Sequence, residues 1–490
     1  MTCVLTIDQG TSRTTAAVID ADGNLLAKGS AEVRSFWPHP GWVEQDAEAI
    51  WQGVLAAVRR ALVAVDVSIS GVALTGQRES VLLWGDDGRP ASPVVVWQDR
   101  RTTAYVEGLR RQGVGERVHE LTGLIIDPYF SAPLLHWLLH EGSRSGRRRV
   151  HFGNPVAWML YKLTGVHAMD ASNAARTLLF DLDKRAWCEE LLELFEIPPD
   201  ILPSVVDCVG PLGVVSGVRE LEGVPVVAMV GDMQGALLGA GGAREGVCKV
   251  TYGTAGNVGL ALGSRPVLGR TAPVTVEYSM GGRARYCAEG NVFVVGGAVE
   301  WLRRVGVLPC VAHIDDLAAR LPEDSELMFV PAFAGLGTPY WEPRVRGCIL
   351  GLDLGVTQGH LIQALLEGIS LRVHQCLNAF RDELEAPVGQ LRADGGLAQS
   401  DVLMQLQADL SGVPVERLSL TEGTSLGAAR LAFCGLGVYD AQDLASPPLA
   451  LDRFEPRCGA AWRDEKMHRF EKAVGGLMGV AQPPDLEIPG

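Results

Sequence analysis

The alternation of apolar and polar positions along the chain predicts both strands and helices. Short apolar runs that end in glycine or charge predict strands at 4–7, 16–20 and 71–75. Apolar residues at helical spacing predict helices with one buried face over 50–65 and 361–373. Mixed strands and helices of this kind predict an α/β architecture with open sheets.

One strand-and-turn unit occurs twice. Residues 5–11 form an apolar strand that runs into a Gly-Thr turn, and residues 247–254 repeat the design. An apolar stretch resumes after each turn. The spacing of about 240 residues is that of two domains. We therefore predict two halves of similar fold, 1–245 and 246–490, which pack closely because no flexible linker separates them.

Composition and charge restrict the classes of function. A chain of 490 residues is too long for one core, and 47% hydrophobic with 21% charged residues is typical of a soluble globular protein. The net charge of −15 argues against a nucleic-acid partner. Arg147–Arg149 is the densest basic run, and we interpret it as a solvated helix end.

The cysteines and histidines carry no metal or disulfide pattern. Ten cysteines are scattered singly, which predicts a reduced cytoplasmic protein. We predict no signal peptide and no membrane span, because no apolar stretch is long enough. His136 and His140 have helical spacing, but the glutamate of a zinc protease is missing between them. We interpret them as core or surface histidines.

Charged residues follow two of the predicted strands. Arg78 and Glu79 come directly after the strand at 71–75, and Asp232 follows the apolar run 224–230. Ligands bind at the carboxyl ends of strands in α/β sheets, and a carboxylate there can act as a general base toward a hydroxyl. For any one of these residues alone, ordinary solvation of a strand end explains the charge as well.

Both Gly-Thr turns suit phosphate. Glycine lets the backbone approach an anion, and threonine adds a hydroxyl donor. Asp8, beside the first turn, could hold Mg²⁺, which prefers one or two carboxylates with substrate oxygens. A hairpin turn without a ligand is the simpler reading of either turn alone.

A third glycine-containing segment, 393–398, precedes a predicted helix that Ser400 caps and Gly412 ends. Its glycines would let a nucleotide lie against the backbone, and the helix N-terminus adds a favourable field. The chain has no Gly-x-x-x-x-Gly-Lys-Ser/Thr loop, which excludes a Walker-type NTPase.

Taken together, these motifs resemble the FGGY carbohydrate kinase family, and within it the branch that phosphorylates glycerol. The similarity spans nearly the whole chain. It is carried by segments 8–11, 40–46, 76–79, 96–102, 127–131, 231–232, 251–254, 331–341 and 394–396. It implies two actin-like (ribonuclease H-like) ATPase domains, with ATP and Mg²⁺ in the cleft between them and a small polyol deeper in the N-terminal domain.

The resemblance also implies roles for single residues. Arg78 and Glu79 match the pair that hydrogen-bonds the polyol hydroxyls. Trp97 matches the aromatic wall along its carbon chain, and Tyr129 a further hydroxyl contact. Asp232 matches the catalytic base, with Asp8 as the Mg²⁺ ligand. The residues matched to phosphate contacts are Thr11, Ser12, Gly253 and Thr254, and those matched to the nucleoside are Gly296, Glu300, Gly396 and Ser400.

The chain departs from the glycerol-phosphorylating branch at several positions. Met233 replaces the glutamine after the catalytic aspartate, and Asn257 replaces a phenylalanine beside the acceptor. Thr15 aligns with an arginine, and we hypothesise that Arg13 supplies that charge instead. The loop that binds fructose bisphosphate in some relatives has no counterpart at 216–225, so we expect no such regulation.

Three functions remain open from the sequence. The first is ATP-dependent phosphorylation of glycerol, with Asp232 as general base. The second is a kinase of the same family for another small polyol or ketose, such as erythritol, threitol or a xylulose-like sugar. The third is a non-catalytic actin-like nucleotide-binding protein. The resemblance further implies a homo-oligomer, either a dimer or a tetramer.

Overall fold

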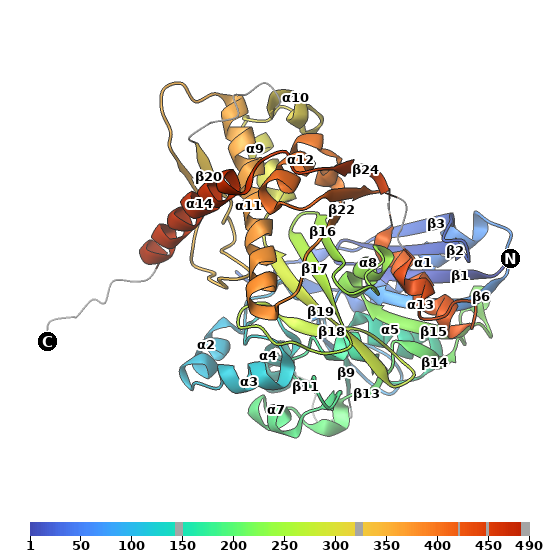
Figure 1. The fold of residues 1–490 in the computed structure, drawn as a ribbon. Coiled ribbons are helices and arrows are strands. Elements are labelled where there is room, and N and C mark those ends of the chain that lie inside the picture. Colours follow the sequence, from blue (N-terminus) through green and yellow to red (C-terminus); the bar gives the residue numbers. More distant parts are fainter. Residues whose placement is uncertain (143–149, 319–326, 420–421, 447–449, 482–490) are drawn as a thin grey trace, which may run out of the picture.

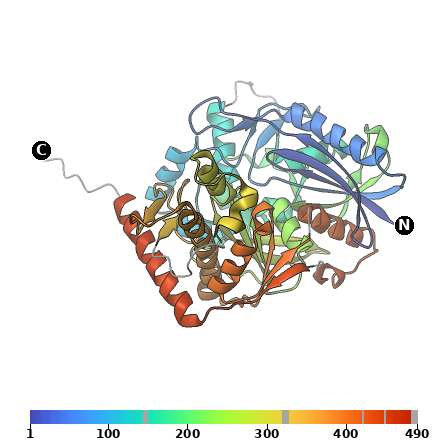
Figure 2. The ribbon, with the colours of Figure 1, turned by 90° about the horizontal axis from the view of Figure 1, so that it is seen from above.

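The computed structural model describes residues 1–142, 150–318, 327–419, 422–446 and 450–481. Arg147–Arg149 lies outside them. One mixed sheet of 13 strands runs through both halves of the molecule, in the order β24-β23-β22-β16-β17-β19-β18-β14-β15-β6-β1-β2-β3 (Figure 1). The strands at the N-terminus and helix α14 (Ala460–Ala481) lie at opposite ends of the molecule (Figure 2).

The strands of this sheet divide by sequence into two sets. The first set is β1 (Cys3–Gln9), β2 (Arg13–Asp20), β3 (Leu25–Glu32), β6 (Ile69–Gly76), β14 (Val209–Val214) and β15 (Pro225–Gly231). The second set is β16 (Cys248–Tyr252), β17 (Gly256–Gly263), β18 (Val274–Met280), β19 (Arg283–Val292), β22 (Leu391–Asp394), β23 (Val415–Leu418) and β24 (Ala450–Phe454).

The two sets repeat one arrangement. In the first, β1 is antiparallel to β2 and parallel to β6, β2 is antiparallel to β3, and β6 is parallel to β15. In the second, β16 is antiparallel to β17 and parallel to β22, β17 is antiparallel to β19, and β22 is parallel to β23. The predicted internal repeat and α/β fold are therefore confirmed. The sets join where Val209 of β14 pairs with Met280 of β18.

The helices form where the apolar spacing predicts them. In α1 (Ala47–Val63), Asp46 caps the N-terminus and the buried face, which includes Ile50 and Val54, packs against β2 and β3. Further helices are α4 (Ser131–Trp137), α7 (Glu189–Leu194), α9 (Gly296–Arg304), α11 (Gln358–Leu384) and α12 (Asp401–Ser411). Ser400 caps α12, and Gly412 ends it with a left-handed φ of 69°.

Helix α8 (Asp232–Gly239) of the first half crosses α13 (Gly423–Gly435) of the second with almost no side chain between them. A Cβ on Gly427 would lie 1.8 Å from the carbonyl oxygen of Gly235, and one on Gly239 would lie 2.1 Å from that of Gly423. Only glycine allows backbones to approach this closely. The crossing therefore fixes α8, and with it Asp232, against α13, which itself packs on β1, β6 and β15 of the first half.

None of the helices in the described part of the chain is both long and apolar enough to span a bilayer. All ten cysteines are free, and Cys310 is exposed.

Candidate functional site

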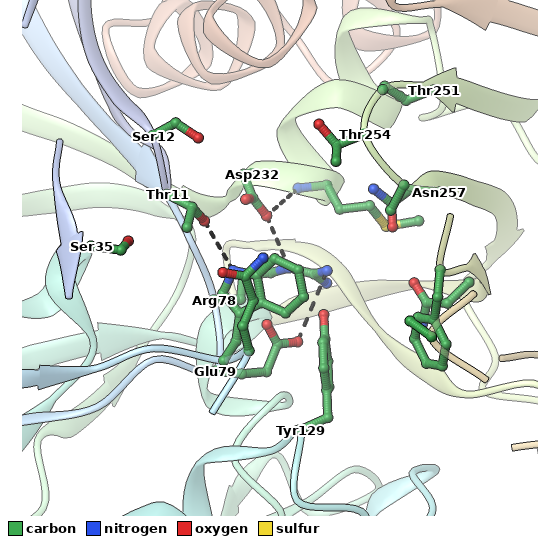
Figure 3. A pocket seen from close by; sticks show the side chains of 18 of the residues that line it. Thr11, Ser12, Ser35, Arg78, Glu79, Tyr129, Asp232, Thr251, Thr254 and Asn257 are labelled. Carbon is green, nitrogen blue, oxygen red and sulfur yellow. Dashed lines mark hydrogen bonds and ion pairs between the residues drawn. The ribbon is translucent and has the colours of Figure 1, made fainter. Parts of the chain in front are cut away.

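A cavity of about 1300 Å³ lies between the two halves, and both halves line it (Figure 3). Most of the residues that the sequence predicts for the site meet here. These are Thr11, Ser12, Arg78, Glu79, Trp97, Tyr129, Asp232, Met233, Gly253, Thr254 and Asn257. Hereafter this cavity is called the cleft.

The sheet explains why the charged residues converge. Strands β6 and β15 are parallel neighbours, with Gly76 opposite Gly231, so their carboxyl ends lie side by side. Arg78 and Glu79 follow the first strand, and Asp232 follows the second as the first residue of α8. Glu79 has a left-handed φ of 56°, a conformation that costs a non-glycine residue roughly 1 kcal/mol and clusters at functional sites.

A ring of buried ion pairs lies beneath the cleft. Arg78 binds Glu289 through Nη1, and Glu289 lies 3.1 Å from Nη2 of Arg176. Arg176 donates from Nε to Glu79 over 2.6 Å, and Glu79 lies 3.9 Å from Arg78. Burial raises the pKa of Glu79 despite both arginines. For Glu289, burial acts in the same direction, but Arg176 and Arg78 outweigh it and the pKa is lowered.

Asp232 shares the same guanidinium. Nε of Arg78 donates to Oδ1 of Asp232 over 3.0 Å, and the backbone N–H of Met233 donates to the same oxygen over 2.7 Å. Burial raises the pKa of Asp232, while Arg78 and the Met233 N–H act to lower it. Oδ2 keeps no partner among the described residues. One oxygen is thus held in place, and the other is available to accept a proton.

Asp8 lies at the end of β1, next to the cleft rather than on its wall. Its Oδ1 is buried and has no hydrogen-bond partner within the described ranges. Burial, with the charges of Asp232 and Glu422, raises the pKa of Asp8 to about 7. An unpaired carboxylate beside a second carboxylate is the donor set that a hard divalent cation binds.

The two aromatic side chains predicted as a wall of the site lie against each other. Trp97 and Tyr129 meet edge to face with ring centroids 5.6 Å apart. The indole Nε1 of Trp97 donates to Oγ1 of Thr11 over 2.9 Å, which ties the wall to the first Gly-Thr turn. Burial, followed by the charge of Glu79, raises the pKa of Tyr129, so its hydroxyl stays neutral and can donate.

The second Gly-Thr turn faces the first across the cleft. The N–H of Gly296, the first residue of α9, donates to the carbonyl of Gly253 over 2.9 Å, so the helix begins beside this turn. Lys249 also lines the cleft, and its Nζ lies 2.7 Å from Oδ1 of Asp394. The residues that suit phosphate are therefore on opposite walls.

The structure does not bring every predicted residue to the cleft. Arg13 is exposed at the start of β2, and Glu300 is exposed on α9, where it pairs with Arg303. Gly396 is exposed beyond β22. Ser400 is buried as the cap of α12 and donates to Asp315. None of the four is among the residues that line the cleft.

Sequence reasoning missed three buried members of the site, Arg176, Glu289 and Gln234. Gln234 donates to Oε1 of Glu289 over 3.2 Å and accepts from Arg78. The available signal was a charged residue inside an apolar stretch, since Glu289 lies in buried β19 and Arg176 between alanines and leucines. Their pairing across the two halves has no local signature.

Two family models match the chain. The N-terminal domain of the FGGY family of carbohydrate kinases matches residues 3–239, and the C-terminal domain of the same family matches residues 248–436. The chain belongs to this family of kinases. The third function that the sequence left open, a non-catalytic nucleotide-binding protein, is therefore set aside.

Relatives in sequence and structure agree with this assignment. The glycerol kinase of Citrifermentans bemidjiense is 41% identical over 97% of this chain and 98% of the relative, and that of Alkalilimnicola ehrlichii is 38% identical over 99% and 100%. The crystal structure of Plasmodium falciparum glycerol kinase with ADP superposes with a TM-score of 0.90, at 26% identity and 98% coverage of both chains. Xylulose kinase from Rhodospirillum rubrum gives 0.88 at 25% identity, over 98% and 99%.

Proposed function

We propose that the protein transfers the γ-phosphoryl group of ATP to a primary hydroxyl of glycerol, giving glycerol 3-phosphate and ADP. One observation carries the proposal: Arg78, Glu79, Trp97, Tyr129 and Asp232 line one cleft. A triol offers only hydroxyls and a thin carbon edge, so its site needs paired polar groups and an aromatic plate. The two glycerol kinases described above are 41% and 38% identical to this chain, which supports the same acceptor.

In the proposed mechanism, Oδ2 of Asp232 accepts the proton of the attacking hydroxyl as its oxygen approaches the γ-phosphorus in line with the leaving oxygen. Arg78 holds Oδ1 and favours the charged form of the carboxylate, which a general base requires. Backbone N–H groups and hydroxyls at Thr11 and Thr254 would stabilise the equatorial charge of the transferred group. The rest of the rate enhancement would come from positioning the acceptor hydroxyl and the γ-phosphate relative to each other.

Asp8 is the proposed ligand of Mg²⁺. Its unpartnered Oδ1 and raised pKa fit a carboxylate whose charge a cation would stabilise. A bound Mg²⁺ would neutralise charge on the phosphates of ATP. Asp8 would hold the ion near the two Gly-Thr turns, where the phosphates are proposed to bind. Closure of the cleft would exclude water, which otherwise competes with the acceptor hydroxyl.

The proposal is tested by ADP release with Mg·ATP against glycerol, erythritol, threitol, xylitol, dihydroxyacetone and common ketoses. We expect the highest kcat/KM for glycerol, by tenfold or more, with the phosphorylated product identified by mass. A higher kcat/KM for a four- or five-carbon acceptor would reject glycerol, and ADP release independent of any acceptor would reject the kinase.

A second acceptor class has a specific observation in its favour. Met233 and Asn257 both line the cleft, at the two positions where the chain departs from the glycerol-phosphorylating branch. The amide of Asn257 is polar and smaller than a phenyl ring. A tetritol or a ketose could use this space, and the same panel decides between the two classes.

The domain boundary near residue 245 is part of this proposal, and the gap between the two matched family domains supports it. A cytoplasmic location and assembly into dimers or tetramers stay predictions.

A further inference from the structure

Away from the cleft, three side chains of metal-ligand type gather on the surface of the first half. His136 lies on α4, His140 in the π-helical turn Leu138–Gly142 that follows it, and Glu196 just beyond the end of α7. One ligand atom of each lies within 4.8 Å of those of the other two. The two histidines alone do not make a metal site, and Glu196 from a distant segment supplies the third ligand group.

The distances are close to those of a metal centre. Oε2 of Glu196 lies 3.6 Å from Nε2 of His140 and 3.9 Å from Nδ1 of His136. Ligands bound to a tetrahedral Zn²⁺ at about 2.0–2.2 Å lie about 3.3–3.5 Å from one another. Shifts of a few tenths of an ångström in flexible side chains therefore suffice to bring the histidine–carboxylate pairs to binding distance.

The local structure holds the three groups together. The π-helical turn replaces the regular helix between the two histidines, and their ring centroids lie 4.4 Å apart. Tyr105 stacks on His136 at 4.2 Å with an interplanar angle of 8°, which fixes the plane of that ring. Glu196 has a left-handed φ of 55°. Turns of the π type and left-handed non-glycine residues are both enriched at functional sites.

Without a metal, Nδ1 of His136 donates to the carbonyl oxygen of Phe195 over 3.0 Å. A neutral imidazole carries one proton, so Nδ1 can bind a cation once that proton is on Nε2. The cluster exposes His140 and Glu196 to solvent, so an ion can enter without rearrangement of the core.

We propose that His136, His140 and Glu196 bind one divalent transition-metal ion, of the class of Zn²⁺, Co²⁺ or Ni²⁺. Imidazole nitrogens with one carboxylate select these ions over Mg²⁺ and Ca²⁺, which prefer oxygen. The site is therefore chemically distinct from the proposed Mg²⁺ site at Asp8. A bound ion would link the C-terminal end of α4 to the C-terminal end of α7 and so stabilise this part of the first half.

The test is a calorimetric titration of the chelator-treated full chain with Ni²⁺, together with the visible absorption of the Co²⁺ form. All proteins carry Cys310→Ser, because that exposed thiol is a competing metal ligand. We expect one saturable ion per chain and a rise in the thermal midpoint at saturation. Glu196→Gln and His140→Gln should each weaken binding by more than about tenfold.

The matched control is His468→Gln, which removes an exposed histidine on α14 and should leave the affinity unchanged. Circular dichroism of each variant checks that the fold is kept. Absence of a saturable site in the parent protein overturns the proposal, and so does an affinity that Glu196→Gln and His140→Gln leave unchanged.

Discussion

Nε of Arg78 lies 3.0 Å from Oδ1 of Asp232. Through this contact the proposed base is attached to a buried ring of two arginines and two glutamates, which includes Glu289 of the second half. The guanidinium of Arg78 therefore orients the proposed base, pairs with Glu79, the proposed acceptor ligand, and binds Glu289 of the second half. Changes to the ring should affect stability and catalysis together.

Asp232→Asn should abolish transfer while the fold is kept. The amide is nearly the same shape and can still accept from Arg78, but it cannot take a proton. We expect kcat to fall by about 10³-fold, within the usual range for loss of a general base. Steady-state ADP release measures this, with the thermal midpoint and ATP binding as controls. A rate close to that of the parent would remove Asp232 from this role.

Arg176→Met should destabilise the protein strongly. It leaves Glu79 and Glu289 buried with one cation fewer, and breaking a buried ion pair in this way costs about 3–5 kcal/mol. Urea unfolding measures the change. Arg303→Met is the matched control, because it removes an ion pair with Glu300 that is exposed to solvent, and exposed pairs contribute little to stability. Equal effects of the two substitutions would contradict the structural role of the ring.

Asn257→Phe should sharpen the preference for glycerol. The phenyl ring fills space beside the acceptor, so kcat/KM for four-carbon polyols should fall relative to glycerol by about tenfold, the size of effect that one hydrophobic contact gives. The KM for ATP should stay the same, and this serves as the internal control. Unchanged ratios across the acceptor panel would show that Asn257 does not face the acceptor.

His374 on α11 should make the protein sensitive to acid. Burial, then the charges of Arg381 and Arg463, lowers its pKa to about 4, against about 6.5 in an unfolded chain. Asp464 and Glu471 line the same cavity. Because the folded pKa is depressed, the neutral ring stabilises the fold fully above pH ~6.5, and this contribution of roughly 3 kcal/mol is lost as the pH falls to about 4.

His374→Gln should therefore flatten the loss of unfolding free energy between pH ~6.5 and ~4. Urea unfolding at a series of pH values measures the slope. His313→Gln, at an exposed position outside this cavity in the turn Val311–His313, should leave the slope as it is in the parent. A slope that His374→Gln does not change would show that this histidine is not the acid-sensitive group.

Gly427→Ala should disrupt the contact between α8 and α13. The added Cβ would lie 1.8 Å from the carbonyl oxygen of Gly235, so a backbone must move, and we expect a cost of about 3 kcal/mol together with reduced activity. Gly475→Ala is the matched control. It lies in α14 with no atom within 4 Å of the added Cβ, so it should be neutral or slightly stabilising. Similar unfolding curves for both would mean that the crossing is looser than described.

Local patterns predicted much of the fold. Apolar spacing placed α1 and α11, and the cap and stop signals at Ser400 and Gly412 gave the bounds of α12. These succeed because helix periodicity and capping depend on neighbours within a few residues. The repeated Gly-Thr hairpins predicted two halves of similar fold, because a strand and its turn are also encoded by neighbouring residues.

What the sequence could not predict depends on pairing between distant segments. Glu289 meets Arg78 and Arg176 only because the strands of both halves join in one sheet. Glu196 reaches the two histidines of the α4 segment in the same way, from another helix end. Capping signals also identified Ser400 correctly as a helix cap, but could not tell that this role places it away from the cleft.

The contact of α8 with α13 also limits how the enzyme can move. Two helices whose backbones touch cannot slide along each other, but they can rotate relative to each other about the point of contact. In such a rotation the displacement of an atom grows with its distance from the point of contact. Asp232, at the start of α8, would therefore move little compared with residues at the outer ends of each half. The enzyme would thus keep its proposed proton acceptor almost stationary while the two walls of the cleft that carry the Gly-Thr turns move apart and together.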